Sequence, residues 1–301
     1  MNNILNLLNE LLNKEYEHNE KGKILSGLVE KPITFRVNTL KTTVEAVKKT
    51  LNDLGIGLKE VEWNENALII ENVSLSEIKE LDLYKNGEIY LQSLSSMIPA
   101  LIVNPKENEN ILDMCSAPGG KTTQMACISN NKAMITATEK NKIRLDRLKY
   151  NLDKQGATRV SVLQKDSRFL DDFFSFDKIL LDAPCSGSGT IDLNNENTYK
   201  NFTEELIKRS IKRQKDLLRK AVRILKPNGE LIYSTCSILK EENEENINEI
   251  LKQPNIELVP IEDEIFNTIP TLPTTLEGTI TVCPTNMYEG FFVAKLRKLK
   301  L

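Results

Sequence analysis

From residue 109 onward, apolar segments that favour β-strands alternate with amphipathic segments that favour α-helices. The predicted strands cover residues 109–115, 133–139, 159–166, 177–185 and 230–236. A long helix is expected to begin near Thr203, a suitable N-cap, and to end at the Pro227-Asn228-Gly229 turn. Elements in this order predict a mostly parallel sheet with right-handed crossovers, and therefore an α/β fold. The segments GTITVCP and GFFVAKLRK near the end predict a closing antiparallel pair of strands.

The first part of the chain follows a different pattern. The predicted elements are an amphipathic helix at the start, a strand TFRVNT, a helix VEAVKKTLNDLG, strands LKEVEW and ALIIE, a short helical stretch and a strand EIYLQS. This mixture predicts a small α+β module packed against the larger domain. We expect the boundary near residues 90–105 and divide the chain into domains 1–95 and 96–301.

Composition excludes several classes of protein. The chain has 301 residues and a net charge of −3, and we find no apolar run of about 18 residues, so we expect a soluble cytoplasmic protein without a membrane partner. The five cysteines form no CxxC pair, which disfavours a disulfide framework and a zinc site. His18 is the single histidine, so catalysis is expected to use Cys, Asp, Glu, Lys or Tyr, without a metal.

The segment 111–123, ILDMCSAPGGKTT, ends in a sequence that resembles half of a phosphate-binding loop. A P-loop needs a glycine at position 115, where this chain has Cys115, and Pro118 removes one of the backbone donors such a loop uses. The P-loop interpretation is therefore disfavoured. What remains is a strand, a glycine-containing turn and a helix, which is how a doubly wound domain receives a nucleotide-like cofactor.

Polar or reactive side chains follow the ends of the predicted strands, where ligands bind in open parallel sheets. They are Cys115 to Lys121, Glu139, Asp166, Asp182 to Cys185, and Cys236. Each carboxylate alone could be a strand-end cap, but their concentration at one edge favours a cofactor site. Glu139 stands 19 positions after Gly120, close to the spacing at which an acidic residue binds ribose hydroxyls.

Two cysteines lie in turns of unusual composition, DAPCSGSGT around Cys185 and STCS around Cys236. A single cysteine is usually a small buried hydrophobe. Turn-forming residues and hydroxyls around the sulfur are atypical of core packing, however, and a neighbouring cation such as Lys121 stabilises a thiolate. Both cysteines are therefore predicted to have chemical roles.

Three motifs in this order, DMCSAPGGKT, LLDAPCSGSGT and YSTCSI, resemble the Fmu/Sun family of RNA cytosine-5 methyltransferases, the group that includes RsmB and RsmF. The upstream segment RVNTLK and the final YEGFFVAKLRK fit the same family, so the resemblance covers roughly residues 30 to 300. It implies a Rossmann-like methyltransferase domain over 96–301, an RNA-binding module over 1–95, and S-adenosylmethionine as cofactor. Longer members carry extra domains that help choose the RNA, which leaves the target open.

The resemblance also implies roles for individual residues. The cofactor would be held by Cys115, Ser116, Ala117, Pro118, Gly119, Gly120, Lys121, Glu139, Arg144, Asp166 and Asp182, with Glu139 on the ribose and Asp166 on the adenine. Catalysis would use Cys236 as nucleophile, Cys185 to assist release, Asp182 facing the base, and Lys121. RNA would be contacted by Arg36, Asn38, Lys212, Arg213 and Arg219.

The chemistry of cytosine agrees with two thiols and no histidine. Carbon 5 is a poor nucleophile until a thiolate adds to carbon 6, and the proton on carbon 5 must leave before that thiol is expelled. The base must also leave its stack, which favours single-stranded or remodelled RNA in rRNA or tRNA. The basic run 207–226 then becomes a phosphate contact, although a solvated helix face explains it equally well.

Two other functions stay open from the sequence. A DNA cytosine-5 methyltransferase shares the thiolate chemistry but uses the cysteine of the Pro-Cys turn. A non-catalytic ribosome-assembly factor would keep the fold only to bind RNA. We expect a monomer in each case.

Overall fold

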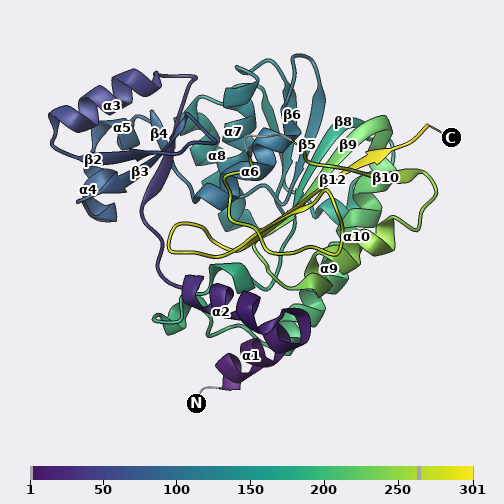
Figure 1. Ribbon diagram of the computed structural model, residues 1–301. Coiled ribbons are helices and arrows are strands. Elements are labelled where there is room, and N and C mark those ends of the chain that lie inside the picture. Colours follow the sequence, from purple (N-terminus) through teal and green to yellow (C-terminus); the bar gives the residue numbers. More distant parts are fainter. Residues whose placement is uncertain (1–2, 263–265, 301) are drawn as a thin grey trace.

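The computed structural model describes residues 3–262 and 266–300 of the chain. Its central feature is an eight-stranded sheet in the order β10-β12-β9-β8-β5-β6-β7, with β11 paired to β12 (Figure 1). The strands are β5 (Asn110–Met114), β6 (Met134–Thr138), β7 (Val160–Leu163), β8 (Phe176–Asp182), β9 (Leu225–Thr235), β10 (Ile256–Val259), β11 (Ile280–Val282) and β12 (Phe291–Lys298). The strands β5 to β9 pair in parallel, as the β-α-β pattern predicts. The predicted closing pair is confirmed, because β11 and β12 are antiparallel.

Helices cover both faces of this sheet. On one face lie α6 (Leu94–Val103), α7 (Gly120–Ile128) and α8 (Lys142–Gln155), and on the other lie α9 (Glu204–Ile224) and α10 (Glu244–Ile250). Side chains of each strand alternate between the two cores, so that Ile111 packs on the first face and Leu112 on the second. The α/β, Rossmann-like prediction is therefore confirmed.

The small module is built on a four-stranded antiparallel sheet in the order β2-β3-β1-β4, at the upper left of Figure 1. Its elements are β1 (Thr34–Val37), α3 (Val44–Asp53), β2 (Gly57–Glu60), β3 (Ala67–Glu71), α4 (Leu75–Glu80), α5 (Asp82–Lys85) and β4 (Ile89–Leu91). Buried residues between Phe35 and Ile89 form a core of their own. The domain division at residue 95 stays a prediction.

The chain start differs from the single helix expected there. It forms two helices, α1 (Asn3–Glu15) and α2 (His18–Gly27), because Glu17 starts a new capping box with Glu20. Leu8, Leu12 and Ile24 of these helices pack in a cluster with residues that precede and follow α9, not in the core of the small sheet. Figure 1 shows both helices beside α9, far from β1 to β4.

The end of α9 also corrects the sequence-based prediction. Thr203 is the N-cap, and its Oγ1 accepts a hydrogen bond from the Leu206 amide at 3.1 Å, as expected. The helix ends at Ile224, however, before the Pro-Asn-Gly segment. Asn228 adopts a positive φ of 62°, and the register of β8 against β9 shifts at this point. The tripeptide is therefore an irregularity near the start of β9, where proline needs no ladder partner.

Two residues expected to bind RNA lie in the interior instead. The Arg36 guanidinium is 2 % exposed, donates to Gln92 Oε1 at 3.0 Å and Thr123 Oγ1 at 2.5 Å, and lies over the Tyr90 ring. Asn38 is fully buried and donates to the carbonyl oxygens of Gly87 and Gln155. These contacts join the small module to α7 and α8, because buried polar groups need partners. The prediction that Arg36 and Asn38 contact RNA is wrong for this structure.

Candidate active site

The loop between β5 and α7 is shaped by its backbone. Cys115 and Gly119 have φ angles of 64° and 108°, and Gly119 is the N-cap of α7. Glycine suits position 119 because side chains disfavour such a positive φ. Ser116 fastens the loop to β6, since its amide and its Oγ both donate to the Thr138 carbonyl at 3.0 Å. The resulting turn presents the helix N-terminus toward the edge where β5 and β6 end, which is where anionic groups bind.

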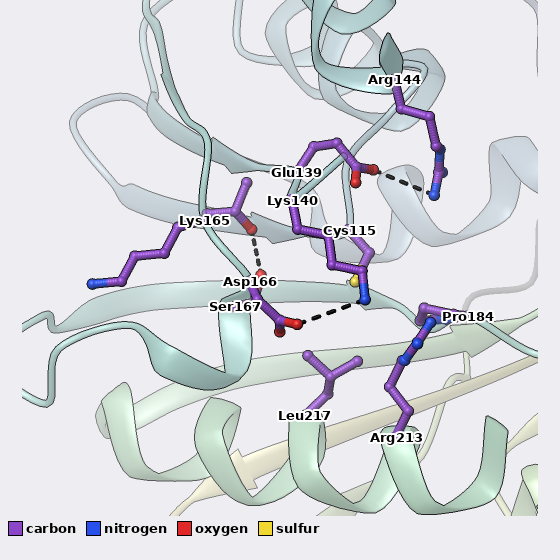
Figure 2. A pocket seen from close by; sticks show the side chains of 11 residues that line it. Cys115, Glu139, Lys140, Arg144, Lys165, Asp166, Ser167, Pro184, Arg213 and Leu217 are labelled. Carbon is purple, nitrogen blue, oxygen red and sulfur yellow. Dashed lines mark hydrogen bonds and ion pairs between the residues drawn. The ribbon is translucent and has the colours of Figure 1, made fainter. Parts of the chain in front are cut away.

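A hollow of about 410 Å³ opens beside this loop (Figure 2). Its lining residues are Cys115, Thr138, Glu139, Lys140, Arg144, Lys165, Asp166, Ser167, Pro184, Arg213 and Leu217. Glu139, Asp166 and Cys115, which follow three different strands, are therefore brought to one pocket as the sequence predicts.

The acidic residues of the pocket are held by cations. Arg144 approaches Glu139 Oε2 at 3.3 Å and donates to the Ala117 carbonyl at 2.6 Å, so that it links the acidic residue to the loop. Glu139 is 4 % exposed and also accepts from the Asn141 amide. The Arg168 hydrogen bond lowers the pKa of Asp166 to about 2. Both carboxylates are thus placed as acceptors for hydroxyl or amino donors of a ligand.

Lys121 and Asp182 form a second polar centre. Lys121 Nζ lies 2.8 Å from Asp182 Oδ2 and 2.8 Å from Ser96 Oγ, and Ser234 Oγ donates to Asp182 Oδ1 at 2.8 Å. The lysine side chain is 11 % exposed and that of Asp182 is 31 % exposed. Asp182 therefore keeps an open side toward solvent while both of its oxygens are oriented by protein donors.

The two predicted cysteines come together. Asp182 of β8 lies in register with Ser234 of β9, so the turns that follow both strands start at the same edge. The sulfur atoms of Cys185 and Cys236 are 3.1 Å apart, and both side chains are half-buried. The pKa of Cys185 is raised well above its ordinary value, first by the hydrogen bond with Cys236 and then by burial. Either thiol can donate the hydrogen bond that joins the two sulfur atoms.

Cys115 is set in the wall of the cofactor pocket. Burial raises its pKa to about 12, so it remains a neutral thiol there. This agrees with a cofactor-lining residue and not with a nucleophile. Among the residues described, no group of three or more His, Cys, Asp or Glu side chains is arranged to hold a metal ion. The helices within residues 3–262 and 266–300 also include none with an apolar stretch of sufficient length to span a bilayer.

The three residues of α9 that were predicted to contact RNA have different surroundings. Lys212 is exposed. Arg219 is exposed but is engaged with Glu249 at 2.8 Å. Arg213 faces the pocket of Figure 2 beside Leu217, one helical turn away. The assignment of Arg213 to the RNA surface alone is therefore corrected, because its side chain lines the same hollow as Glu139.

Several residues that line the pocket were not assigned to the cofactor from the sequence. Lys140, Lys165 and Ser167 are direct neighbours of the predicted Glu139 and Asp166, and Pro184 belongs to the predicted DAPC turn. Arg213 and Leu217 stand at i and i+4 on α9, a spacing that places both on one face. That spacing is visible in the sequence, but which element the face covers depends on the packing of α9 over the sheet.

Comparison with known proteins identifies the family. The sequence model described as "16S rRNA methyltransferase RsmB/F" matches residues 100–297, and the one described as "Methyltr_RsmF/B-like, ferredoxin-like domain" matches residues 8–75. The chain belongs to the RsmB/F methyltransferase family. The resemblance stated from the three motifs is confirmed.

Curated relatives are longer than this chain. The 28S rRNA (cytosine-C(5))-methyltransferase of Mus musculus is 37% identical over 90% of the chain and 35% of its own length. Ribosomal RNA small subunit methyltransferase F of Vibrio parahaemolyticus is 36% identical over 88% of the chain and 56% of its own length. The chain thus spans between about a third and just over half of these relatives.

Solved structures share the whole arrangement. A methyltransferase homologue from Pyrococcus horikoshii has a TM-score of 0.80 and 33% identity, and covers 98% of this chain and 99% of its own. NSun6 from Pyrococcus horikoshii, solved with SFG, has a TM-score of 0.86 and 25% identity, and each chain is covered to 98%. Membership of the RsmB/F family therefore includes the small module as well as the Rossmann-like domain.

Proposed function

We propose that this chain is an S-adenosylmethionine-dependent RNA methyltransferase that forms 5-methylcytidine in rRNA or tRNA through a covalent bond between Cys236 and the base. The observation that carries the proposal is the pair of thiols 3.1 Å apart, at the end of two strands that also supply Asp182. The names of the curated relatives, which describe rRNA cytosine-5 methyltransferases, support it. All of these groups come from one chain, so a monomer is sufficient for the proposed reaction.

The residues present fit S-adenosylmethionine. The hollow is lined by groups that follow three neighbouring strands, and buried Glu139 has a carboxylate available to ribose hydroxyls. Leu217 supplies an apolar wall beside Asp166, suited to an adenine ring. SFG, the molecule bound in the NSun6 structure, is an analogue of this cofactor. When bound, S-adenosylmethionine supplies an electrophilic methyl group.

The residues of the second centre account for the rest of the reaction. The Cys236 thiolate forms a bond to carbon 6 of cytosine, and the electrons displaced onto carbon 5 make that carbon nucleophilic. Asp182, oriented by Lys121 and Ser234, faces the ring and relays a proton to its nitrogen 3, which neutralises the negative charge that develops when carbon 6 is attacked. After methyl transfer, a base removes the proton from carbon 5. The carbon–sulfur bond then breaks, the ring double bond re-forms and Cys236 is released.

Cys185 is suited to that last step because its environment changes during the reaction. In the free protein, its hydrogen bond to Cys236 is the first cause of its raised pKa. Once Cys236 sulfur is bonded to carbon 6, it no longer carries a negative charge, so this cause is removed. The Cys185 thiol then loses its proton to solvent more readily, and the resulting thiolate can accept the carbon 5 proton. The same thiol is hydrogen-bonded to Cys236 before the attack and acts as a base after it.

The proposed activity is tested by incubating the protein with methyl-labelled S-adenosylmethionine and either total RNA or DNA of similar length. We expect label in RNA, at carbon 5 of cytosine, and none in DNA. Label in DNA alone would favour the DNA methyltransferase alternative. An absence of label in both, with RNA still bound, would favour the non-catalytic assembly factor. Bisulfite mapping of rRNA and tRNA from cells lacking the protein identifies the nucleotide.

Removing the Glu139 side chain is expected to weaken cofactor binding. Glu139→Ala loses hydrogen bonds between a carboxylate and the ribose hydroxyls, worth about 1.5–3 kcal/mol, and releases Arg144 from its ion pair. Titration calorimetry with S-adenosylmethionine measures the change. Asp146→Ala is the matched control, because this exposed carboxylate on α8 pairs with Lys142 and does not line the pocket. Equal affinities for Glu139→Ala and the control would reject the ribose assignment.

The outward face of α9 is proposed to contact RNA phosphates through Lys212 and Arg219. Replacing both by Gln should reduce the salt dependence of RNA binding by about 0.7 log units for each phosphate of a single strand that the protein ceases to neutralise. Cofactor affinity should stay unchanged, since neither residue lines the pocket. The control replaces Lys106 and Lys132, exposed residues that precede β5 and β6 at the opposite edge of the sheet. Similar salt slopes for both double variants would leave α9 as a solvated face.

A further inference from the structure

A carboxylate with no place in the mechanism above lies fully buried behind the two thiols. Glu242 ends the short 3₁₀ turn Lys240–Glu242, six residues after Cys236, and its side chain is 0 % exposed. Burying a carboxyl group is costly unless its oxygens are hydrogen-bonded. Burial raises the pKa of Glu242, while hydrogen bonds from Ser186, Ser237 and Gln214 oppose that rise. The donors of these hydrogen bonds show which residues the Glu242 carboxylate holds in place.

Two of the hydrogen bonds to the Glu242 side chain come from Ser186, the residue that follows Cys185. Oε1 accepts from the Ser186 amide at 2.8 Å, and Oε2 accepts from Ser186 Oγ at 2.5 Å. Gln214 of α9 donates to Oε1 at 3.1 Å and, at 3.0 Å, to the carbonyl of Pro184. Glu242 and Gln214 therefore hold the backbone on both sides of Cys185.

Glu242 and Gln214, which together hold the backbone around Cys185 and are called the clamp below, are themselves hydrogen-bonded to the sheet and to the helices. The Glu242 carbonyl accepts from Tyr233 Oη of β9 at 2.6 Å and from Asn246 Nδ2 of α10 at 2.9 Å. Asn246 also donates to Gln214 Oε1 at 2.9 Å. A rigid support of this kind fixes a side chain more precisely than a free loop does. The Cys185 turn is thus tied to β9, α9 and α10 at once.

We infer that Glu242 is a positioning residue that holds the DAPC turn so that the Cys185 sulfur stays next to Cys236 and, later, next to the carbon 5 proton. This inference rests on the proposed function, because it assigns Glu242 to the release step that Cys185 performs. Glu242 has a positioning role and no part in proton transfer, because its carboxylate oxygens accept hydrogen bonds from protein donors and the side chain is not exposed.

Truncation of Glu242 should therefore reproduce the loss of Cys185. Glu242→Ala frees Ser186, and misplacement of a reacting group by about 1 Å is enough to slow a step by roughly 10²-fold. We expect single-turnover methyl transfer to continue and a protein–RNA adduct to accumulate on denaturing electrophoresis, as for Cys185→Ala. Glu242→Gln is expected to behave as the native protein. Its amide oxygen can accept from the Ser186 amide and its N–H can donate to Ser186 Oγ, which keeps the geometry without the charge.

The matched control is Glu244→Ala. Glu244 is also buried, lies two residues further along, and bonds to Thr274 instead of the DAPC turn. It should lose stability without accumulating adduct, which separates positioning from general loosening of the fold. Titration with S-adenosylmethionine measures the fraction of each sample that is folded and able to bind the cofactor. If Glu242→Ala does not fold, Gln214→Leu decides the matter, since it removes the donor to Pro184 and to Glu242 and should also accumulate adduct.

The outcomes distinguish this inference from the proposed function. If Cys185→Ala gives no adduct, the assigned role of that thiol fails, and the Glu242 inference fails with it. If Cys185→Ala gives adduct but Glu242→Ala (or Gln214→Leu in its place) releases RNA at the native rate, only the positioning role is overturned. If Glu242→Gln is as defective as Glu242→Ala, the negative charge and not the geometry is what matters, and the inference is also overturned.

Discussion

Cys236→Ala is expected to abolish methylation and to leave no covalent intermediate, whereas Cys185→Ala is expected to accumulate a protein–RNA adduct that survives denaturing electrophoresis. The two sulfur atoms are only 3.1 Å apart, so the difference reflects the order of bond changes and not their positions. Without Cys236 no bond to carbon 6 forms, and the rate should fall to the background of the assay. Without Cys185 the attack and the methyl transfer proceed, and only the release is slow.

The double variant Cys185→Ala with Cys236→Ala provides the control, because it should form no adduct. Adduct in Cys236→Ala and none in Cys185→Ala would reverse the roles and favour the arrangement of DNA methyltransferases, which use the Pro-Cys thiol. Full methylation by both single variants would remove thiols from the mechanism. The measurement uses labelled RNA in an amount stoichiometric with the protein and an excess of S-adenosylmethionine. Denaturing gels then separate the adduct from the released product, so that both are quantified together.

The sequence predicted which residues lie together at one edge of the sheet better than it predicted the contacts of each residue. Alternation of apolar strands with amphipathic helices placed Glu139, Asp166, Asp182 and Cys236 at one edge, because parallel strands end on the same side of a sheet. Periodicity carries no information about what lies above that edge. The approach of Arg213 to the cofactor pocket and the clamp on Cys185 both depend on how α9 crosses the sheet, which only the packed structure shows.

Arg36 and Asn38 illustrate the opposite error. A cation and an amide in a motif shared with RNA-modifying relatives suggest phosphate contacts, but both are buried between two modules. In a single sequence, a buried arginine that satisfies carbonyl and hydroxyl acceptors has the same appearance as an exposed one. The clue was the two-residue spacing in TFRVNT, which places Arg36 of β1 and Asn38, just after the strand, on one side of the chain that the larger domain could cover.

Asp182→Asn is expected to lower kcat by about 10²–10⁴-fold, the usual contribution of a positioned acid–base group, with a much smaller change in cofactor affinity. Asparagine has nearly the same shape as aspartate. Its amide oxygen can accept from Lys121 and its N–H can face Ser234 Oγ, so the strand end should keep its geometry. What is lost is the carboxyl group that exchanges a proton with the ring nitrogen while carbon 6 is attacked.

This failure should differ from that of Cys185→Ala, because Asp182 acts at or before the attack on carbon 6. Asp182→Asn should therefore lower both methyl transfer and adduct formation in single-turnover experiments. Ser234→Ala is the matched control: it removes one hydrogen bond to the same carboxylate but keeps its charge, and should cost roughly tenfold, equivalent to ~1.4 kcal/mol. If Asp182→Asn accumulates adduct, Asp182 belongs to the release step instead. If both variants lose activity equally, the orientation of the carboxylate matters more than its charge.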